Sequence, residues 1–234
     1  MRRLAIATMC VALLDMLLEV SPFVPAVSPR GRLAQAATAD CIVLEDFSGS
    51  AEKAFPEGWR VRKDAGREAY SVRVDGGVRF LRASAKDMGI QAAKQREWDL
   101  GQYPVLAWKW RPREFPKGAN EQSGKNDSVL SVYAMFPHSR ISVKSVKYIW
   151  SEKVPAGTHL ESSQGLTQVL VLRSGAPANR DAWVEERGNV AQDYRRFFNE
   201  TQLPKPMGIA VLTDSDDTNS FAEGDYTDFR ACKS

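Results

Sequence analysis

The sequence is poor in the side chains that bind transition metals. Its 234 residues include two histidines and three cysteines, and neither H-E-x-x-H nor C-x-x-C occurs. A zinc site would need about two to four more imidazole or thiolate ligands at suitable spacing. The motifs G-x-S-x-G and G-x-x-x-x-G-K-[ST] are also missing, so neither an esterase nucleophile elbow nor a phosphate-binding loop is present. Nothing in the sequence supports dinucleotide binding.

The chain also lacks a strong charge of one sign. It carries 32 Lys+Arg against 29 Asp+Glu, a net charge of +3. Nucleic acid therefore has no global electrostatic attraction to it, and we expect no nucleic-acid partner. Arg140, Lys144 and Lys147 form a local basic cluster, which we interpret as the solvated face of a strand.

Long hydrophobic runs are missing as well. The run Leu4–Leu14 is too short for a bilayer, which takes about 20 apolar residues, but it follows Arg2 and Arg3 and precedes two small-x-small motifs between residues 34 and 39. This order is typical of a signal peptide. We predict a signal peptide over residues 1–39, a periplasmic or secreted protein, and no transmembrane segment after cleavage. A buried N-terminal helix is the alternative.

Cysteine usage agrees with export. Cys10 lies in the expected signal peptide, which leaves Cys41 and Cys232 at the two ends of the mature chain. In an oxidising compartment this pair predicts a disulfide, although two free thiols would fit the same count. The disulfide requires the first and last strands to be neighbours. We expect a monomer.

Strand-like segments recur through the mature chain. Several alternate apolar and polar residues, and Asp75-Gly76-Gly77 is a strong hairpin signal. The expected strands are Cys41–Phe47, Trp59–Lys63, Tyr70–Val74, Val78–Ser84, Gly89–Lys94, Val105–Arg111, Val129–Phe136, Ser145–Trp150, Gln168–Arg173, Trp183–Arg187, Met207–Thr213 and Tyr226–Ala231.

One helix is expected among these strands. Asn189 can cap it, with Gln192 three residues later, and an apolar stripe follows at i, i+4, i+7 and i+8: Val190, Tyr194, Phe197 and Phe198. Many short strands with one short helix near 190–199 predict a mainly all-β fold. We expect a single jelly-roll or concanavalin-like β-sandwich domain over residues 40–234.

Acidic residues follow the strand Met207–Thr213. Asp214, Asp216 and Thr218 are spaced i, i+2, i+4, and Asp225 falls at the twelfth position from Asp214. Clustered oxygen ligands suit Ca²⁺, so these four are candidate calcium ligands and calcium is the one candidate cofactor. The alternative is a turn whose Asp side chains bind local backbone N–H groups.

Other side chains suggest a ligand surface. Trp108 and Trp110 share one strand face, and Trp150 lies on another strand. Exposed, these rings would stack against sugars, with polar contacts from Arg187, Asp193, Asp214 and Asp216; buried, they would be core residues. A catalytic carboxylate pair drawn from the three aspartates is also possible. Glu185 and Glu186 point to opposite faces of a strand, and an ion pair of Glu185 with Arg187 is the simpler interpretation.

Four segments carry a family resemblance. W-K-W at 108–110, Y-I-W at 148–150, W-V-E-E-R-G-N-V-A-Q-D-Y at 183–194 and G-I-A-V-L-T-D-S-D-D-T at 208–218 resemble the exported bacterial domain-of-unknown-function family DUF3047. The resemblance spans the mature chain. It implies a secreted or periplasmic β-rich domain, similar in architecture to jelly-roll carbohydrate-binding modules, and it implies no substrate.

Three functions remain open from the sequence. The leading hypothesis is a non-catalytic exported domain that binds a glycan or another envelope ligand. The alternatives are a carbohydrate-active hydrolase or lyase that uses paired carboxylates, and a purely structural envelope protein whose aromatic and acidic motifs only build the fold.

Overall fold

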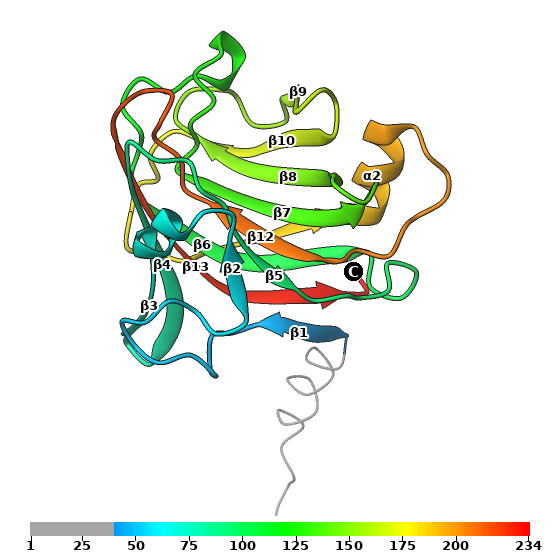
Figure 1. Cartoon of the computed structure of the whole chain (residues 1–234), viewed down its shortest axis with the longest axis horizontal. Coiled ribbons are helices and arrows are strands. Elements are labelled where there is room, and N and C mark those ends of the chain that lie inside the picture. Colours follow the sequence, from blue (N-terminus) through cyan, green and yellow to red (C-terminus); the bar gives the residue numbers. More distant parts are fainter. Residues whose placement is uncertain (1–39) are drawn as a thin grey trace, which may run out of the picture.

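Two β-sheets stacked face to face form the body of the protein (Figure 1), in a computed structural model that describes residues 40–234. The predicted signal peptide, residues 1–39, lies outside the described residues. Within them, no helix has the length and apolarity needed to cross a bilayer.

The first sheet has six strands in the order β11-β6-β13-β4-β3, with β1 paired to β13 beyond the end of β4. All of its strand pairs are antiparallel. Its strands are β1 (Cys41–Glu45), β3 (Tyr70–Asp75), β4 (Val78–Lys86), β6 (Val105–Glu114), β11 (Val184–Asn189) and β13 (Phe221–Cys232).

The second sheet has seven strands in the order β2-β5-β12-β7-β8-β10-β9. β8 and β10 run parallel, and the other pairs of this sheet are antiparallel. Its strands are β2 (Trp59–Val61), β5 (Ala92–Gln95), β7 (Leu130–Pro137), β8 (Val143–Ser151), β9 (His159–Ser162), β10 (Thr167–Ser174) and β12 (Gly208–Leu212).

Alternation along the strands places one face of each sheet in the core. On β7, Val132, Ala134 and Phe136 point inward and are fully buried, whereas Tyr133 and Met135 belong to a separate apolar cluster on the outer face. The predicted jelly-roll β-sandwich is therefore confirmed. The outer face of the seven-stranded sheet does not pack in the main core.

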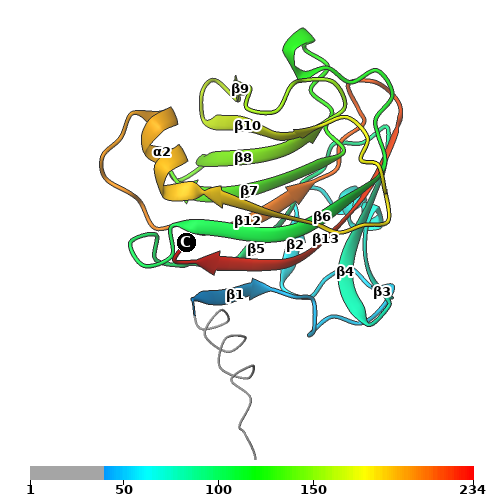
Figure 2. The ribbon, with the colours of Figure 1, turned by 180° about the vertical axis from the view of Figure 1, so that it is seen from behind.

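The predicted helix is α2 (Val190–Phe198), which lies at one end of the sandwich while the β3–β4 hairpin lies toward the other (Figure 2). Asn189 caps it, because its side-chain oxygen accepts a hydrogen bond from Gln192 N (3.0 Å). The ring of Tyr194 packs on Phe136 with centroids 4.6 Å apart. Two short 3₁₀ turns, η1 (Asp64–Ala69) and η2 (Glu121–Ser123), lie in the connections.

The predicted disulfide is present. Cys41 pairs with Cys232 in the β1–β13 ladder, and a Cys41–Cys232 disulfide joins the two strands across 191 residues of sequence. The first and last strands are thus neighbours, as this bond requires.

The expected strands differ from the structure in both sheets. In the first, β13 begins at Phe221 and not at Tyr226, and β6 extends to Glu114. β9 was not predicted, because His-Leu-Glu-Ser at 159–162 is short and has one apolar residue. The strand expected from Gly89 begins at Ala92, since Gly89 packs against the side chains of Asp214 and Asp216. The Asp75-Gly76-Gly77 hairpin is confirmed: both glycines have positive φ, and Asp75 pairs with Val78.

Candidate functional site

The three predicted stacking tryptophans do not lie on a surface. Trp108 and Trp110 have no exposed area and Trp150 is 3% exposed. Trp108 stacks on Tyr148 (centroids 5.4 Å apart), and Trp110 packs on Trp150 (5.8 Å). These rings fill the space between the two sheets, so the expectation of an exposed platform is wrong and the core interpretation holds.

Arg187 and Asp193 lie on β11 and α2, where each has a partner within the fold. Arg187 Nη1 is 3.6 Å from Glu185 Oε1, as the simpler interpretation expected. Tyr148 Oη donates a hydrogen bond to Asp193 Oδ2 (2.6 Å). Burial raises the pKa of Asp193, although the Tyr148 hydrogen bond opposes this shift. Neither side chain meets Asp214 or Asp216 in a common site.

The predicted calcium ligands do not converge either. Asp225 is fully buried on the six-stranded sheet, where it accepts hydrogen bonds from Arg82 (2.8 Å), Arg111 (2.8 Å) and Arg113 (3.0 Å). With three guanidinium partners, Asp225 is used in an ion-pair network, so its assignment as a calcium ligand is wrong. Thr218 Oγ1 donates to Asp127 instead (2.5 Å).

A different set of carboxylates does come together. Asp127, Asp216 and Asp217 each place an oxygen within 4.8 Å of the others. Asp127 already accepts hydrogen bonds from the backbone N–H groups of Asp217 (3.1 Å) and Thr218 (2.8 Å). This buried carboxylate fixes the loop after β12 to the segment before β7. The turn interpretation expected side chains of the loop itself to bind these N–H groups, whereas the acceptor lies 90 residues away from Asp217 in sequence.

The side chains of Asp214 and Asp216 both lie next to Gly89, in the loop that precedes β5. A Cβ on Gly89 would lie 2.4 Å from Asp214 Oδ1 and 2.9 Å from Asp216 Oδ1, so glycine lets the backbone approach both carboxyl groups. Burial, together with Asp216 and Asp127, outweighs the nearby Lys147 and raises the pKa of Asp214 to about 8. Asp214 is 9% exposed, and its Oδ1 has no hydrogen-bond donor within the described chain.

A groove runs over the outer face of the seven-stranded sheet. It has a volume of about 580 Å³, and its floor includes Tyr133 of β7, Leu212 of β12 and Ser145 of β8. Because Tyr133 alternates with inward-facing residues of β7, its ring points away from the core. We call this hollow the Tyr133 groove.

Loops from distant parts of the sequence form the sides of the Tyr133 groove. Residues 62–63, after β2, and residues 89–91, before β5, contribute to its lining. Residues 162–163 and 166–167, around the β9–β10 turn, contribute as well. The lining combines hydroxyl and amide groups with one aromatic ring, several aliphatic side chains and two cations, Arg62 and Lys63.

The floor of the Tyr133 groove adjoins a buried cation. Lys147 of β8 pairs directly with Tyr133 in the β7–β8 ladder, and its Nζ lies 5.4 Å from the centroid of that ring. Lys147 is 8% exposed. Burial alone would lower its pKa, but Tyr133, Asp214 and Glu121 outweigh this effect and raise it.

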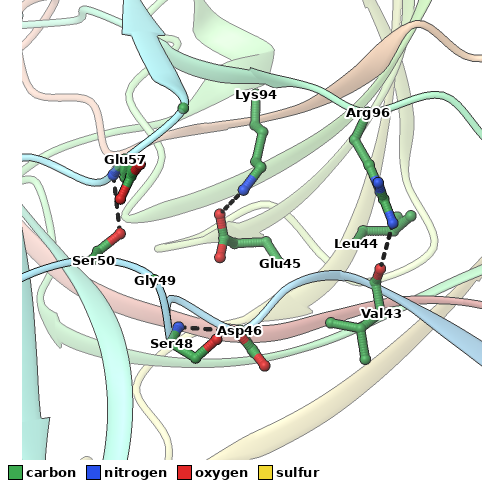
Figure 3. Close-up of a pocket in the computed structure, with 11 residues that line it drawn as sticks. Val43, Leu44, Glu45, Asp46, Ser48, Gly49, Ser50, Glu57, Lys94 and Arg96 are labelled. Carbon is green, nitrogen blue, oxygen red and sulfur yellow. Dashed lines mark hydrogen bonds and ion pairs between the residues drawn. The ribbon is translucent and has the colours of Figure 1, made fainter.

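A second hollow, beside β1 and β5, has a volume of about 450 Å³ (Figure 3). Several of its polar groups are occupied by protein partners. Lys94 Nζ donates to Glu45 Oε2 (2.5 Å), and Trp59 Nε1 donates to the same oxygen (2.8 Å). Arg96 reaches the carbonyl oxygen of Val43 (3.4 Å). These contacts tie β1 to the seven-stranded sheet, so we assign this hollow a structural role.

Sequence reasoning missed the floor of the groove. Tyr133 stands in an apolar central strand, one of several aromatics that would suit a sugar if exposed, and the sequence gives no reason to prefer it; Lys147 is expected on a solvated face but is buried. The available signal was the polar side chains within the two apolar runs, Ser131 and Tyr133 in β7 and Lys144, Ser145 and Lys147 in β8. The loops that form the sides have no shared pattern in the sequence.

The fold and this site define a jelly-roll β-sandwich with an open groove across one sheet. The chain belongs to the family described as protein of unknown function DUF3047, whose model matches residues 57–230. No curated protein matches the sequence.

Solved structures of low similarity include two sugar-binding modules and an enzyme. A family 29 carbohydrate-binding module from Piromyces equi is 7% identical with a TM-score of 0.36, over 83% of this chain and 90% of its own. The CBM22-1 xylan-binding domain from Paenibacillus barcinonensis is 12% identical with a TM-score of 0.36, over 82% and 95%. The family 11 xylanase from Neocallimastix patriciarum is 12% identical with a TM-score of 0.37, over 81% and 97%. At this level of similarity, function must be argued from the residues of this chain.

Proposed function

We propose that this protein is an exported, non-catalytic domain that binds a glycan in the Tyr133 groove. The observation that carries the proposal is the lining of the groove. Tyr133, 7% exposed, and Ser145 form part of the floor, and Gln91 and Thr167 add amide and hydroxyl groups to the lining. Sugar rings present apolar C–H faces and a belt of hydroxyls, so they need an aromatic surface and neutral hydrogen-bonding groups together.

Export is the part of the proposal that rests on the sequence and on the disulfide. The order of residues at the N-terminus is that of a signal peptide, and a structural disulfide persists in oxidising compartments. The Cys41–Cys232 bond is therefore in keeping with a protein that folds outside the cytoplasm.

Affinity electrophoresis tests the binding. The purified protein is run through gels containing xylan, mixed-linkage β-glucan, galactan, polygalacturonate or alginate, and we expect at least one to retard it. Tyr133→Leu keeps an apolar floor but removes the ring, and it should weaken binding about tenfold, the equivalent of roughly 1.4 kcal/mol of lost stacking.

Tyr103→Leu is the matched control, because Tyr103 is a half-buried tyrosine outside the groove lining. It should migrate like the unaltered protein. Normal mobility of the unaltered protein in all five gels would contradict glycan binding.

A hydrolase or lyase remains the second candidate, and Asp214 is the observation that favours it. A carboxyl group with a pKa of about 8, beside the carboxyl of Asp216, has the protonation expected of a general acid. Neither side chain lines the groove. Shortening of a polysaccharide by the protein, abolished in Asp214→Asn, would replace the binding proposal with this one.

A further inference from the structure

The charged residues that line the Tyr133 groove are all positive. Arg62 and Lys63 are its charged lining residues, and no Asp or Glu of the described chain contributes to the lining. The whole chain carries a net charge of only +3, so this excess of positive charge is local to the groove.

The cations at the groove are also free of ion-pair partners. Within residues 40–234, no carboxylate oxygen lies within 4.0 Å of the charged nitrogens of Arg62, Lys63 or Lys147. By contrast, Lys94 at the second hollow is paired with Glu45 at 2.5 Å. An unpaired cation in or beside a concave surface attracts anions more strongly than one on a flat surface, because the low-dielectric walls focus its field.

The acidic groups near the groove lie outside its lining. Asp214 and Asp216 lie next to Gly89 but outside the lining, and Asp214 is mostly protonated at neutral pH. Glu121 is occupied by hydrogen bonds from Ser128 Oγ (2.8 Å) and Ser151 Oγ (2.6 Å). Asp64 and Glu161 are exposed neighbours that do not line the groove.

We propose that the groove selects an acidic glycan, whose carboxylate or sulfate groups contact Arg62 and Lys63 while its sugar rings lie over Tyr133. This inference rests on the proposed glycan binding and narrows it to one class of ligand.

Matched pairs of polysaccharides test the charge without changing the sugar. The first pair is polygalacturonate and fully methyl-esterified pectin, in which the carboxylates are masked. The second is dextran sulfate and dextran. We expect retardation by at least one acidic member and none by its neutral partner, and the pair that responds identifies the anion as carboxylate or sulfate.

A change of salt concentration and a double substitution test whether Arg62 and Lys63 bind the acidic polysaccharide. Raising NaCl from 20 to 300 mM should release the protein from the acidic polysaccharide, because screening weakens exposed charge pairs. The double variant Arg62→Gln/Lys63→Gln should lose about five- to tenfold in affinity at low salt. Both residues are exposed, so the fold should be unaffected.

The control removes the same charge elsewhere. Lys53→Gln/Arg187→Gln replaces two exposed cations outside the groove lining, and it should bind like the unaltered protein. An equal loss in both double variants would overturn the proposal, because the attraction would then come from overall charge.

Two other outcomes separate this inference from the proposed function. Binding of neutral members as strongly as acidic ones, or of neutral glycans alone, overturns the acidic-glycan inference but leaves glycan binding standing. Retardation by no polysaccharide in either panel overturns both.

Discussion

Asp214 shows how burial and neighbouring carboxyl groups can change the charge of a single side chain. It is 9% exposed and close to two other carboxyl groups, and its pKa is raised to about 8. The native state therefore holds a proton that the unfolded chain releases near the ordinary value of 3.8. Stability is greatest below the unfolded pKa and is lost as pH rises through the folded one.

We predict that the free energy of unfolding falls between pH 5 and pH 9, and that Asp214→Asn removes much of this fall. Asn keeps the shape of the carboxyl group but cannot ionise. At pH 9 the variant should be more stable than the unaltered protein by about 2–5 kcal/mol, since each pKa unit corresponds to about 1.4 kcal/mol. Urea unfolding followed by tryptophan fluorescence at several pH values measures the difference.

Asp64→Asn is the control for charge alone, because Asp64 is an exposed carboxylate at the start of η1. It should keep the pH slope of the unaltered protein. An unchanged slope in Asp214→Asn would mean that Asp214 is ionised in the folded protein at neutral pH.

At the scale of elements, β11 and β8 pack closely because Gly188 has no side chain. Gly188 of β11 faces the ring of Tyr148 on β8, and a Cβ at this position would lie 2.4 Å from Tyr148 Cζ. That ring is fully buried, stacks on Trp108 and donates to Asp193. It has no room to move aside.

Gly188→Ala should therefore lower the free energy of unfolding by about 1–3 kcal/mol, the usual cost of overpacking a core. Gly49→Ala is the matched control, because a Cβ there meets no atom within 4 Å. The control should stay within about 0.5 kcal/mol of the unaltered protein in the same urea titration. Equal stabilities for the two variants would show that the sheets can separate locally at no cost.

At this scale the sequence predicts well where its patterns are local. Alternation and turn residues located the strands, and the Asn189 cap with the Val190 and Tyr194 stripe located α2. The parallel pairing of β8 with β10 has no such signal, because it depends on which strands meet after folding. β9 was missed because its sequence is too short and polar to show a period.

At the scale of the whole molecule, the site residues predicted from the sequence were wrong where their surroundings depend on contacts between residues far apart in the sequence. Asp225 and its partner Arg82 are 143 residues apart in sequence, so no local spacing reveals that this carboxylate is neutralised. Trp108 and Trp110 alternate as a surface stripe would, but the second sheet covers them. The sides of the Tyr133 groove come from three separate loops, and only the fold brings them together.

The disulfide links the first strand to the last and so affects the stability of the whole fold. It joins Cys41 and Cys232 across 191 residues, and it holds β1 against one end of β13. In the chain-entropy model, closing so long a loop restricts the unfolded state by about 5 kcal/mol. Residual structure in the unfolded chain reduces this figure, so about 2–5 kcal/mol is expected.

Cys41→Ser/Cys232→Ser should accordingly unfold at a lower urea concentration than the oxidised protein, with a loss of about 2–5 kcal/mol. Reducing the unaltered protein with dithiothreitol should shift its midpoint toward that of the variant, whereas the reductant should leave the variant itself unchanged. Equal midpoints for the oxidised protein and the variant would mean that the β1–β13 ladder holds the chain ends without the bond. Because β1 also contacts the seven-stranded sheet through Glu45 and Lys94, the variant should still fold, with its loss of stability measurable as a shift in midpoint.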